Sequence, residues 1–166
     1  MENLKVIYDN LSIGIPYFKP EPVNRQHITL KFLGDVDESQ IEVIKNEMLE
    51  LKNYLPVIIN FDGFGVFYRN GKPGILYAKF KNDGKPGLIH SHIEKITRNA
   101  GIPDDSRAFE PHLTLWRIKT SLPENRLKPF LDFNPEVTTG IKLNNISLMK
   151  SELKPAGPVY TKLYTI

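Results

Sequence analysis

Two short segments of this chain nearly repeat each other and carry the residues best suited to chemistry. The first reads His-Ile-Thr-Leu over residues 27–30 and the second reads His-Leu-Thr-Leu over residues 112–115, in opposite halves of the 166 residues. Alternate side chains of a β-strand face the same way, so each segment would present one imidazole and one hydroxyl on one face. Two such strands brought together would gather two histidines and two threonines around one site.

These side chains suit acid–base chemistry on a phosphodiester. An imidazole titrates near neutral pH, so one histidine can accept a proton while another donates one. Phosphodiester hydrolysis needs both steps, because a base deprotonates the attacking oxygen and an acid protonates the leaving oxygen. The hydroxyls of Thr29 and Thr114 suit the non-bridging phosphate oxygens. The pattern alone leaves open that His27 and His112 are structural or simply exposed.

Composition narrows the chemistry further. The chain is 40% hydrophobic and 25% charged, has four histidines and contains no cysteine. Without cysteine there is neither a disulfide framework nor a thiolate nucleophile. The histidines and acids do not have the spacing of a zinc motif, so we expect no metal site. A net charge of +3 is compatible with a phosphate-bearing partner, whereas scattered Lys and Arg residues do not indicate tight binding of duplex DNA.

The sequence also favours a protein of the cytoplasm. It has no run of 18 apolar residues that could cross a membrane, so we expect no membrane partner. The first five residues lack the apolar core of a signal peptide. The absence of cysteine agrees with an intracellular location.

Apolar periodicity and turn residues predict an α+β chain whose halves share an order of elements. Helices are predicted over residues 4–11, Asp37–Leu51, Pro86–Asn99 and Ser121–Leu131, the second opened by a capping box of Asp37 and Gln40. Strands are predicted over residues 26–33, 57–68 (as one strand or two), 74–80, 109–118, 140–151 and 159–164.

In their contexts the two histidine segments resemble the paired HxTx signatures of the 2H phosphoesterase superfamily. The first context is His-Ile-Thr-Leu-Lys-Phe-Leu-Gly over residues 27–34, and the second is Phe-Glu-Pro-His-Leu-Thr-Leu-Trp-Arg over residues 109–117. The chain is most similar to the LigT/ThpR branch, the RNA 2′,3′-cyclic phosphodiesterases also called 2′-5′ RNA ligases. The likeness runs from about Gln26 onward and includes residues 61–67, 151–153 and 157–160.

This resemblance implies one bilobal α+β domain over residues 1–166, with two pseudo-symmetric antiparallel sheets, flanking helices and a central cleft. Members of the branch usually begin with a short apolar strand before the first helix. This chain begins at Glu2-Asn3-Leu4, inside what looks like that helix. We therefore expect the start to be truncated or the usual first strand to be absent, which would expose a sheet edge.

The resemblance also implies an enzyme that hydrolyses an RNA or nucleotide 2′,3′-cyclic phosphate to a 2′-phosphate without metal or cofactor. His27 would be the acid that protonates the leaving O3′, and His112 the base that activates water, with the roles reversed for ligation. Thr29, Thr114 and Arg117 would bind the phosphoryl oxygens. The expected partners of this monomer are RNA ends, including tRNA fragments, or cyclic nucleotides. Reversible 2′-5′ RNA ligation and a non-catalytic module that binds RNA ends are the alternatives.

Strict alternation along the two histidine strands makes three more expectations. Trp116 should share the face of His112, where it could contact a nucleobase or else pack as core. Arg117 should lie on the opposite face, so it reaches a phosphate only if the strand bends, bulges or ends there. Lys31 should share the face of His27 and Thr29, where it could sit at the edge of the cleft, although an exposed role is favoured.

Other candidate residues have weaker signals. Phe64, Phe67 and Tyr68 could line the mouth of a base-binding site, although aromatic residues in strands are usually core. His90 and His92 lie on one predicted helix, and their spacing points them apart. We expect both to face solvent and neither to bind metal.

Overall fold

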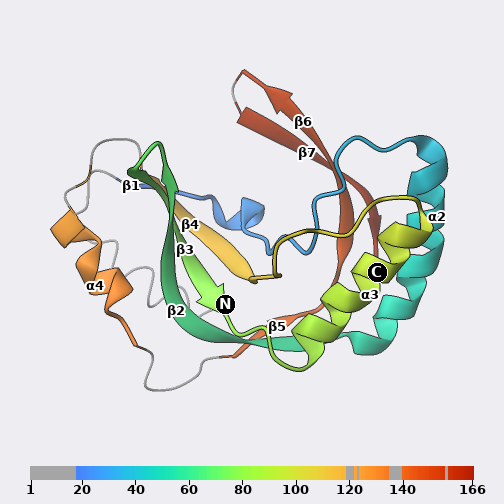
Figure 1. Ribbon diagram of the computed structural model, residues 1–166, viewed down its shortest axis with the longest axis horizontal. Coiled ribbons are helices and arrows are strands. Elements are labelled where there is room, and N and C mark those ends of the chain that lie inside the picture. Colours follow the sequence, from blue (N-terminus) through green and yellow to red (C-terminus); the bar gives the residue numbers. More distant parts are fainter. Residues whose placement is uncertain (1–17, 119–121, 123, 135–139, 156) are drawn as a thin grey trace. The chain divides into compact units, whose positions relative to one another are not determined.

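The computed structural model describes the chain except for residues 1–17, 119–121, 123, 135–139 and 156 (Figure 1). The helix predicted over residues 4–11, the question of a first strand and the capping residue Ser121 lie outside the described part. Two compact units make up the chain. Unit 1 holds Met1–Thr29, Ile59–Asn82 and Glu110–Ile141, and unit 2 holds Leu30–Ile58, Asp83–Phe109 and Lys142–Ile166. The single bilobal domain stays a prediction.

Most of unit 1 is a curled antiparallel sheet, and the α+β class is confirmed. The strand order is β1-β4-β3-β2-β5, and β2 is the long curved strand of Figure 1. Antiparallel pairs join β1 to β4, β4 to β3 and β3 to β2. The strands are β1 (Phe18–Pro20), β2 (Val57–Arg69), β3 (Lys72–Phe80), β4 (His112–Ile118) and β5 (Gly140–Leu143).

Strands β2 and β3 form a hairpin that turns at Asn70 and Gly71. Asn70 and Gly71 have φ angles of 51° and 72°, the left-handed conformation that an Asn-Gly turn provides at little cost. The segment predicted as one strand or two is the single strand β2. Its register shifts between Phe61 and Phe64, where Gly63 has a φ of 101°. The irregularity lets one strand curve through the sheet without breaking.

One face of this sheet carries the aromatic core of unit 1. The ring of Phe64 lies 5.1 Å from that of Phe61 and 5.7 Å from that of Phe130, in edge-on packing. Phe130 belongs to α4 (Lys128–Leu131), which follows η3 (Glu124–Arg126). Buried positions on the strands of this face include Leu76, Ala78, Phe80, Leu113 and Leu115. Alternation therefore turns the polar residues of β3 and β4 to the other face.

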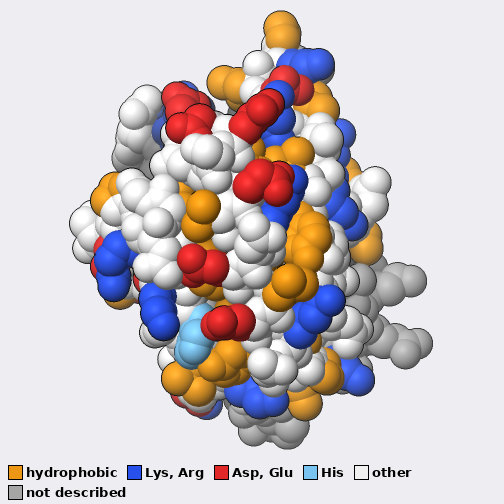
Figure 2. Space-filling view, turned by 90° about the vertical axis from the view of Figure 1, so that its right-hand side faces the viewer, with side chains coloured by type: hydrophobic (Ala, Val, Ile, Leu, Met, Phe, Trp, Pro, Cys, Tyr) orange, Lys and Arg blue, Asp and Glu red, His pale blue; other side chains and the backbone are white. Residues whose placement is uncertain are grey.

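Unit 2 contains the helices α2 (Glu38–Met48) and α3 (Lys85–Asn99), which lie side by side in Figure 1. The capping box of Asp37 and Gln40 is confirmed, and the Ser39 hydroxyl helps hold the pKa of the Asp37 carboxyl below its usual value. The 3₁₀ segment η2 (Leu49–Tyr54) continues α2. Figure 2 shows acidic and basic side chains interspersed on the face it presents, without one continuous basic patch.

A two-stranded antiparallel sheet of β6 (Ser147–Lys154) and β7 (Gly157–Thr165) completes unit 2. The sequence predicts one strand over residues 140–151, and this is wrong. The stretch forms β5 and β6, which belong to different sheets and to different pairings. Local periodicity cannot detect such a change of partner, because both strands have the same alternation. In the described part of the chain, no helix is long and apolar enough to cross a membrane.

Candidate functional site

The two histidine segments meet in unit 1 through one backbone bridge. Ile28 pairs antiparallel with Leu113 of β4. When this antiparallel register is extended by one residue in each direction, His27 lies opposite Thr114 and Thr29 lies opposite His112. The four polar side chains then share one face, and Leu113 is buried on the other. Each histidine therefore faces the threonine of the other segment.

The strand predicted over residues 26–33 is reduced to this single bridge. The 3₁₀ turn η1 (Val23–Arg25) leads into the segment. Thr29 is the last residue of this segment in unit 1, and the residues that follow it form no strand. The bridge is enough to set the register. Directly opposed Cβ atoms lie about 4.5–5.5 Å apart and diagonal ones about 7–8 Å, so the diagonal imidazoles leave room for a phosphoryl group.

Both imidazoles are oriented by the same local hydrogen bond. The Nδ1 atom of His27 lies 2.7 Å from the carbonyl oxygen of Arg25, and Nδ1 of His112 lies 2.8 Å from that of Glu110. A carbonyl oxygen only accepts, so each Nδ1 carries the hydrogen and donates it. The nitrogen whose protonation can change is then Nε2 in both rings. The two histidines can thus serve as one acid and one base through equivalent atoms.

A bulge in β4 decides the faces of Trp116 and Arg117. Thr114 pairs with Tyr77 but Trp116 pairs with Leu76, so β4 has one extra residue at this point. Leu115 and Trp116 are consecutive and both buried, which reverses the alternation that follows.

Beyond the bulge, Arg117 returns to the more exposed side of β4, the side of His112 and Thr114. Strict alternation predicts the opposite face for Arg117, and the bulge overturns it. The Arg117 Nε atom donates to Glu21 Oε2 at 2.8 Å. This ion pair holds the guanidinium beside β1, on the polar face of the sheet.

Trp116 is core, and the expectation that it could contact a nucleobase is wrong. The residue is only 2% exposed. Its ring lies 6.0 Å from the ring of Phe18 and 5.8 Å from that of Phe130. The alternative drawn from the sequence, packing at the strand end, is the one observed. The cause is the bulge, which turns the indole to the buried face.

Sequence reasoning missed the residues that continue the polar face across the sheet. Lys79 stands opposite His112 and Tyr77 opposite Thr114, on the neighbouring strand β3. Opposed side chains share a face, so both lie beside the second histidine segment. Burial and the charge of Glu110 raise the pKa of the Tyr77 hydroxyl. Alternation along β3 could have placed them on one face, but only the pairing of β3 with β4 brings that face to His112.

The aromatic residues of β2 divide between the two faces. Phe64 is core, whereas Phe67 is 41% exposed. The Phe67 ring stacks on Tyr77 with centroids 4.2 Å apart and meets the His112 ring edge-on at 5.0 Å. Tyr77 also packs edge-on against His112, at 5.3 Å. The imidazole of His112 thus has an aromatic wall on the side of β2 and β3.

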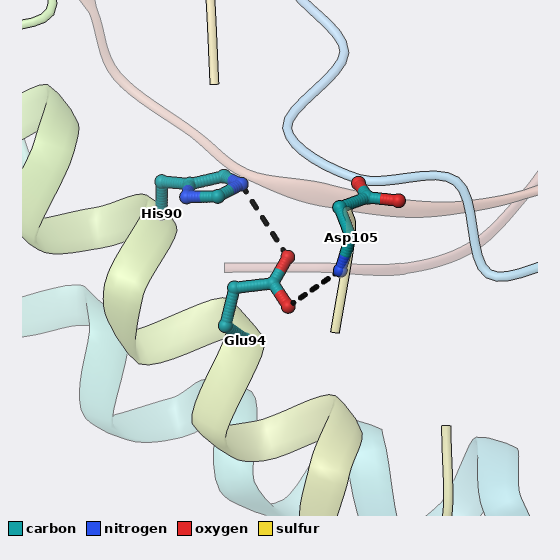
Figure 3. Close-up of side chains that lie close together, drawn as sticks. All are labelled: His90, Glu94 and Asp105. Carbon is teal, nitrogen blue, oxygen red and sulfur yellow. Dashed lines mark hydrogen bonds and ion pairs between the residues drawn. The ribbon is translucent and has the colours of Figure 1, made fainter. Parts of the chain in front are cut away.

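A second group of titratable residues lies within unit 2. His90 and Glu94 stand one turn apart on α3, and Asp105 follows the helix (Figure 3). Their nearest ligand atoms lie within 4.8 Å of one another, close enough to consider a metal ion. However, Glu94 Oε2 already accepts from Lys31 Nζ at 2.6 Å and from the Asp105 N–H at 3.2 Å. Lys31 thereby supplies the positive charge that an ion would bring.

The side chain of Lys31 is buried, so the expected exposed role is wrong. Its side chain is 2% exposed, and that of Glu94 is 12% exposed. The ammonium group also donates to the carbonyl oxygen of Pro103 at 2.9 Å. The Glu94 carboxylate and the Pro103 carbonyl oxygen both accept hydrogen bonds from this cation, so its role in the structure is to pair with Glu94.

Neither His90 nor His92 faces solvent freely, contrary to expectation. The ring of His90 stacks on Phe109 with centroids 4.3 Å apart. The ring nitrogens of His92 lie 2.8 Å from the Tyr54 hydroxyl and 2.8 Å from the Leu88 carbonyl oxygen. The spacing correctly points the two rings apart. Helix α3 is covered on both flanks, so both rings find partners.

Both histidine segments lie within the regions of the chain that match a known protein family. The family of LigT-like phosphoesterases matches residues 1–77 and 87–160. A protein of Aquifex aeolicus named RNA 2′,3′-cyclic phosphodiesterase is 37% identical over 145 residues, which are 85% of this chain and 76% of the relative.

Two solved structures resemble the fold. One from Thermus thermophilus is 28% identical, with a TM-score of 0.63 over 99% of this chain and 91% of that one. The apo form of Escherichia coli LigT is 17% identical, with a TM-score of 0.70 over 99% of this chain and 90% of that one. The resemblance of the fold therefore extends over nearly the whole chain.

Proposed function

Because the chain belongs to the LigT-like phosphoesterase family, we propose that it hydrolyses 2′,3′-cyclic phosphates at RNA ends or on nucleotides to 2′-phosphates. The observation that carries this proposal is the pairing of Ile28 with Leu113, whose register gathers two imidazoles and two hydroxyls on one face. The name of the Aquifex aeolicus relative supports the same substrate. RNA ends, such as tRNA fragments, are the proposed partners of a cytoplasmic monomer.

The hydrolysis requires one side chain that accepts a proton and another that donates one. We assign His112 as the base that removes a proton from water through Nε2 while the water oxygen attacks phosphorus. His27 is the acid whose Nε2 proton passes to O3′ as the P–O3′ bond breaks. The products are a 2′-phosphomonoester and a 3′-hydroxyl, with one water consumed. The hydrogen bonds from Nδ1 to backbone carbonyl oxygens keep both rings oriented for these transfers.

The remaining polar residues would stabilise the charge that develops on phosphorus. The hydroxyls of Thr29 and Thr114 donate to the non-bridging oxygens, where negative charge gathers in the transition state. Arg117 supplies a cation after releasing or sharing Glu21. Lys79, opposite His112 on β3, adds a second positive charge on this face. These fixed donors, together with two proton carriers, suffice for the chemistry without a metal ion.

The wild-type protein is expected to hydrolyse adenosine 2′,3′-cyclic phosphate equally well with and without a chelator. The expected product is adenosine 2′-phosphate, identified by its chromatographic separation from the 3′ isomer, because O3′ is the leaving group assigned to His27. The pH–rate profile should be bell-shaped, since one histidine must be neutral and the other protonated.

Three results would contradict this proposal in different ways. No hydrolysis at all would favour a non-catalytic module that binds RNA ends. A 3′-phosphate product would contradict the assigned leaving group. Loss of activity on chelation, restored by added metal, would contradict the metal-free mechanism. Joining of a 2′,3′-cyclic phosphate end to a 5′-hydroxyl end by the same preparation would support the alternative activity, 2′-5′ ligation, in which the 5′-hydroxyl replaces water as the nucleophile.

A further inference from the structure

We propose that the stacked rings of Phe67 and Tyr77 form a platform that binds the nucleobase of the substrate beside His112. This inference rests on the proposed function, because it extends the phosphate site across β3 and β2. It also assigns to these two residues the base contact that the buried Trp116 cannot make.

The register of the sheet puts the platform beside the phosphate site. Thr114 of β4 is opposite Tyr77 of β3, which is opposite Gly65 of β2. Opposed residues share a face, and Phe67 lies two residues beyond Gly65 on that same face. A nucleotide held by its phosphate at His112 and Thr114 would therefore meet the two rings next.

Gly65 makes the room for this arrangement. A Cβ atom at this position would lie 2.4 Å from Cζ of Tyr77 and 2.5 Å from its hydroxyl oxygen. The phenol ring therefore lies directly over the glycine. Any larger residue at position 65 would push the ring away from Phe67. The glycine thus serves the packing of Tyr77 on the polar face of the sheet.

Exposure and chemistry point to a flat aromatic ligand. Phe67 is 41% exposed although its ring stacks on Tyr77. An exposed aromatic ring beside phosphate-binding groups is the arrangement by which proteins stack unpaired bases. Stacking tolerates every base because each has a π-face, so the platform would favour the presence of a base without selecting its identity.

The test compares a substrate that has a base with one that lacks it. Adenosine 2′,3′-cyclic phosphate and the 2,3-cyclic phosphate of methyl ribofuranoside present the same reacting group. We expect Phe67→Leu, which keeps apolar volume but removes the ring, to raise KM for the adenosine substrate about tenfold. Both kcat and KM for the base-free substrate should stay unchanged. Phe67→Tyr should behave as wild type.

Two further variants make the result specific. Gly65→Ala should also raise KM for the adenosine substrate, because it displaces the Tyr77 ring while leaving Phe67 in place. Tyr68→Leu removes the exposed aromatic residue next in sequence and should change neither substrate. Circular dichroism and thermal unfolding of each variant check that the fold is retained.

The proposal is overturned if Phe67→Leu changes neither substrate. It is also overturned if kcat falls equally for both, since the ring would then act by positioning His112. If the wild type hydrolyses neither substrate, the proposed function is wrong. The platform is then tested separately by measuring the Kd of adenosine 2′-phosphate. In that case Phe67→Leu should weaken binding about tenfold, and an unchanged Kd overturns the platform.

Discussion

Alanine at His112 or His27 is expected to lower kcat for a 2′,3′-cyclic nucleotide by at least about 100-fold, the usual scale for a positioned acid or base. His112→Ala removes the acceptor of the proton from water. His27→Ala removes the donor to O3′, so the leaving oxygen would depart as an alkoxide. The measurement is steady-state hydrolysis in the presence of a chelator, on protein whose thermal unfolding matches the wild type.

A substrate with a better leaving group separates the two roles. A p-nitrophenyl phosphodiester releases a phenolate that needs no proton, so His27→Ala should lose far less activity on it than on the cyclic nucleotide. His112→Ala should lose activity on both, because water must still be deprotonated. The opposite pattern would exchange the assigned acid and base. Full activity of either variant on the cyclic nucleotide would refute the paired mechanism.

His92→Gln is the matched control for these substitutions. It also removes an imidazole, but this one bonds to Tyr54 and to the Leu88 carbonyl oxygen in unit 2. We expect its kcat to equal that of the wild type. A comparable loss in this variant would mean that removing any histidine disturbs the protein, and the assignment of His27 and His112 would lose its support.

Lys31→Met is expected to lower the free energy of unfolding by roughly 3–5 kcal/mol, the cost of leaving a buried charge without its partner. Lys31 and Glu94 are 2% and 12% exposed, and their charged atoms are 2.6 Å apart. Methionine fills the space of the aliphatic stem but leaves the mostly buried carboxylate of Glu94 without the lysine charge, and His90 Nε2, 3.4 Å from Oε1, is then the nearest basic group. Chemical denaturation should show the loss directly, with Tm lower by about 6–20 °C.

Two controls show whether burial is the cause. Lys45→Met breaks an ion pair with Glu42 of nearly the same length, 2.7 Å, but its side chains are 27% and 65% exposed. Its expected cost is only about 0–1 kcal/mol. Adding Glu94→Gln to Lys31→Met removes the stranded charge and should recover most of the lost stability. A loss below about 1 kcal/mol for Lys31→Met would contradict the buried ion pair.

Elements with local signals could be predicted from the amino-acid sequence. The capping box at Asp37 and the end of α3 before Gly101 depend on the conformations of a few neighbouring residues. The repeated His-x-Thr pattern likewise identified both segments of the candidate site. Alternation alone predicted that a histidine and a threonine of each segment share a face.

Such local signals could not show which residues that are distant in sequence contact one another in the fold. Lys31 was expected to be exposed because nothing near it in sequence reveals Glu94. His90 and His92 were expected to face solvent because their spacing does not show what covers α3. Residues 140–151 read as one strand, although β5 and β6 pair with different neighbours.

The register of the candidate site depends on pairing between strands that are distant in sequence. One extra residue in β4 turned Trp116 into the core and brought Arg117 back to the face of His112, because a shift of one residue moves a side chain to the other face. Pairing across β4, β3 and β2 then brought Tyr77 and Phe67 beside His112. The sequence names the residues that could act on a phosphodiester, but the hydrogen bonds between strands select which of them share one face.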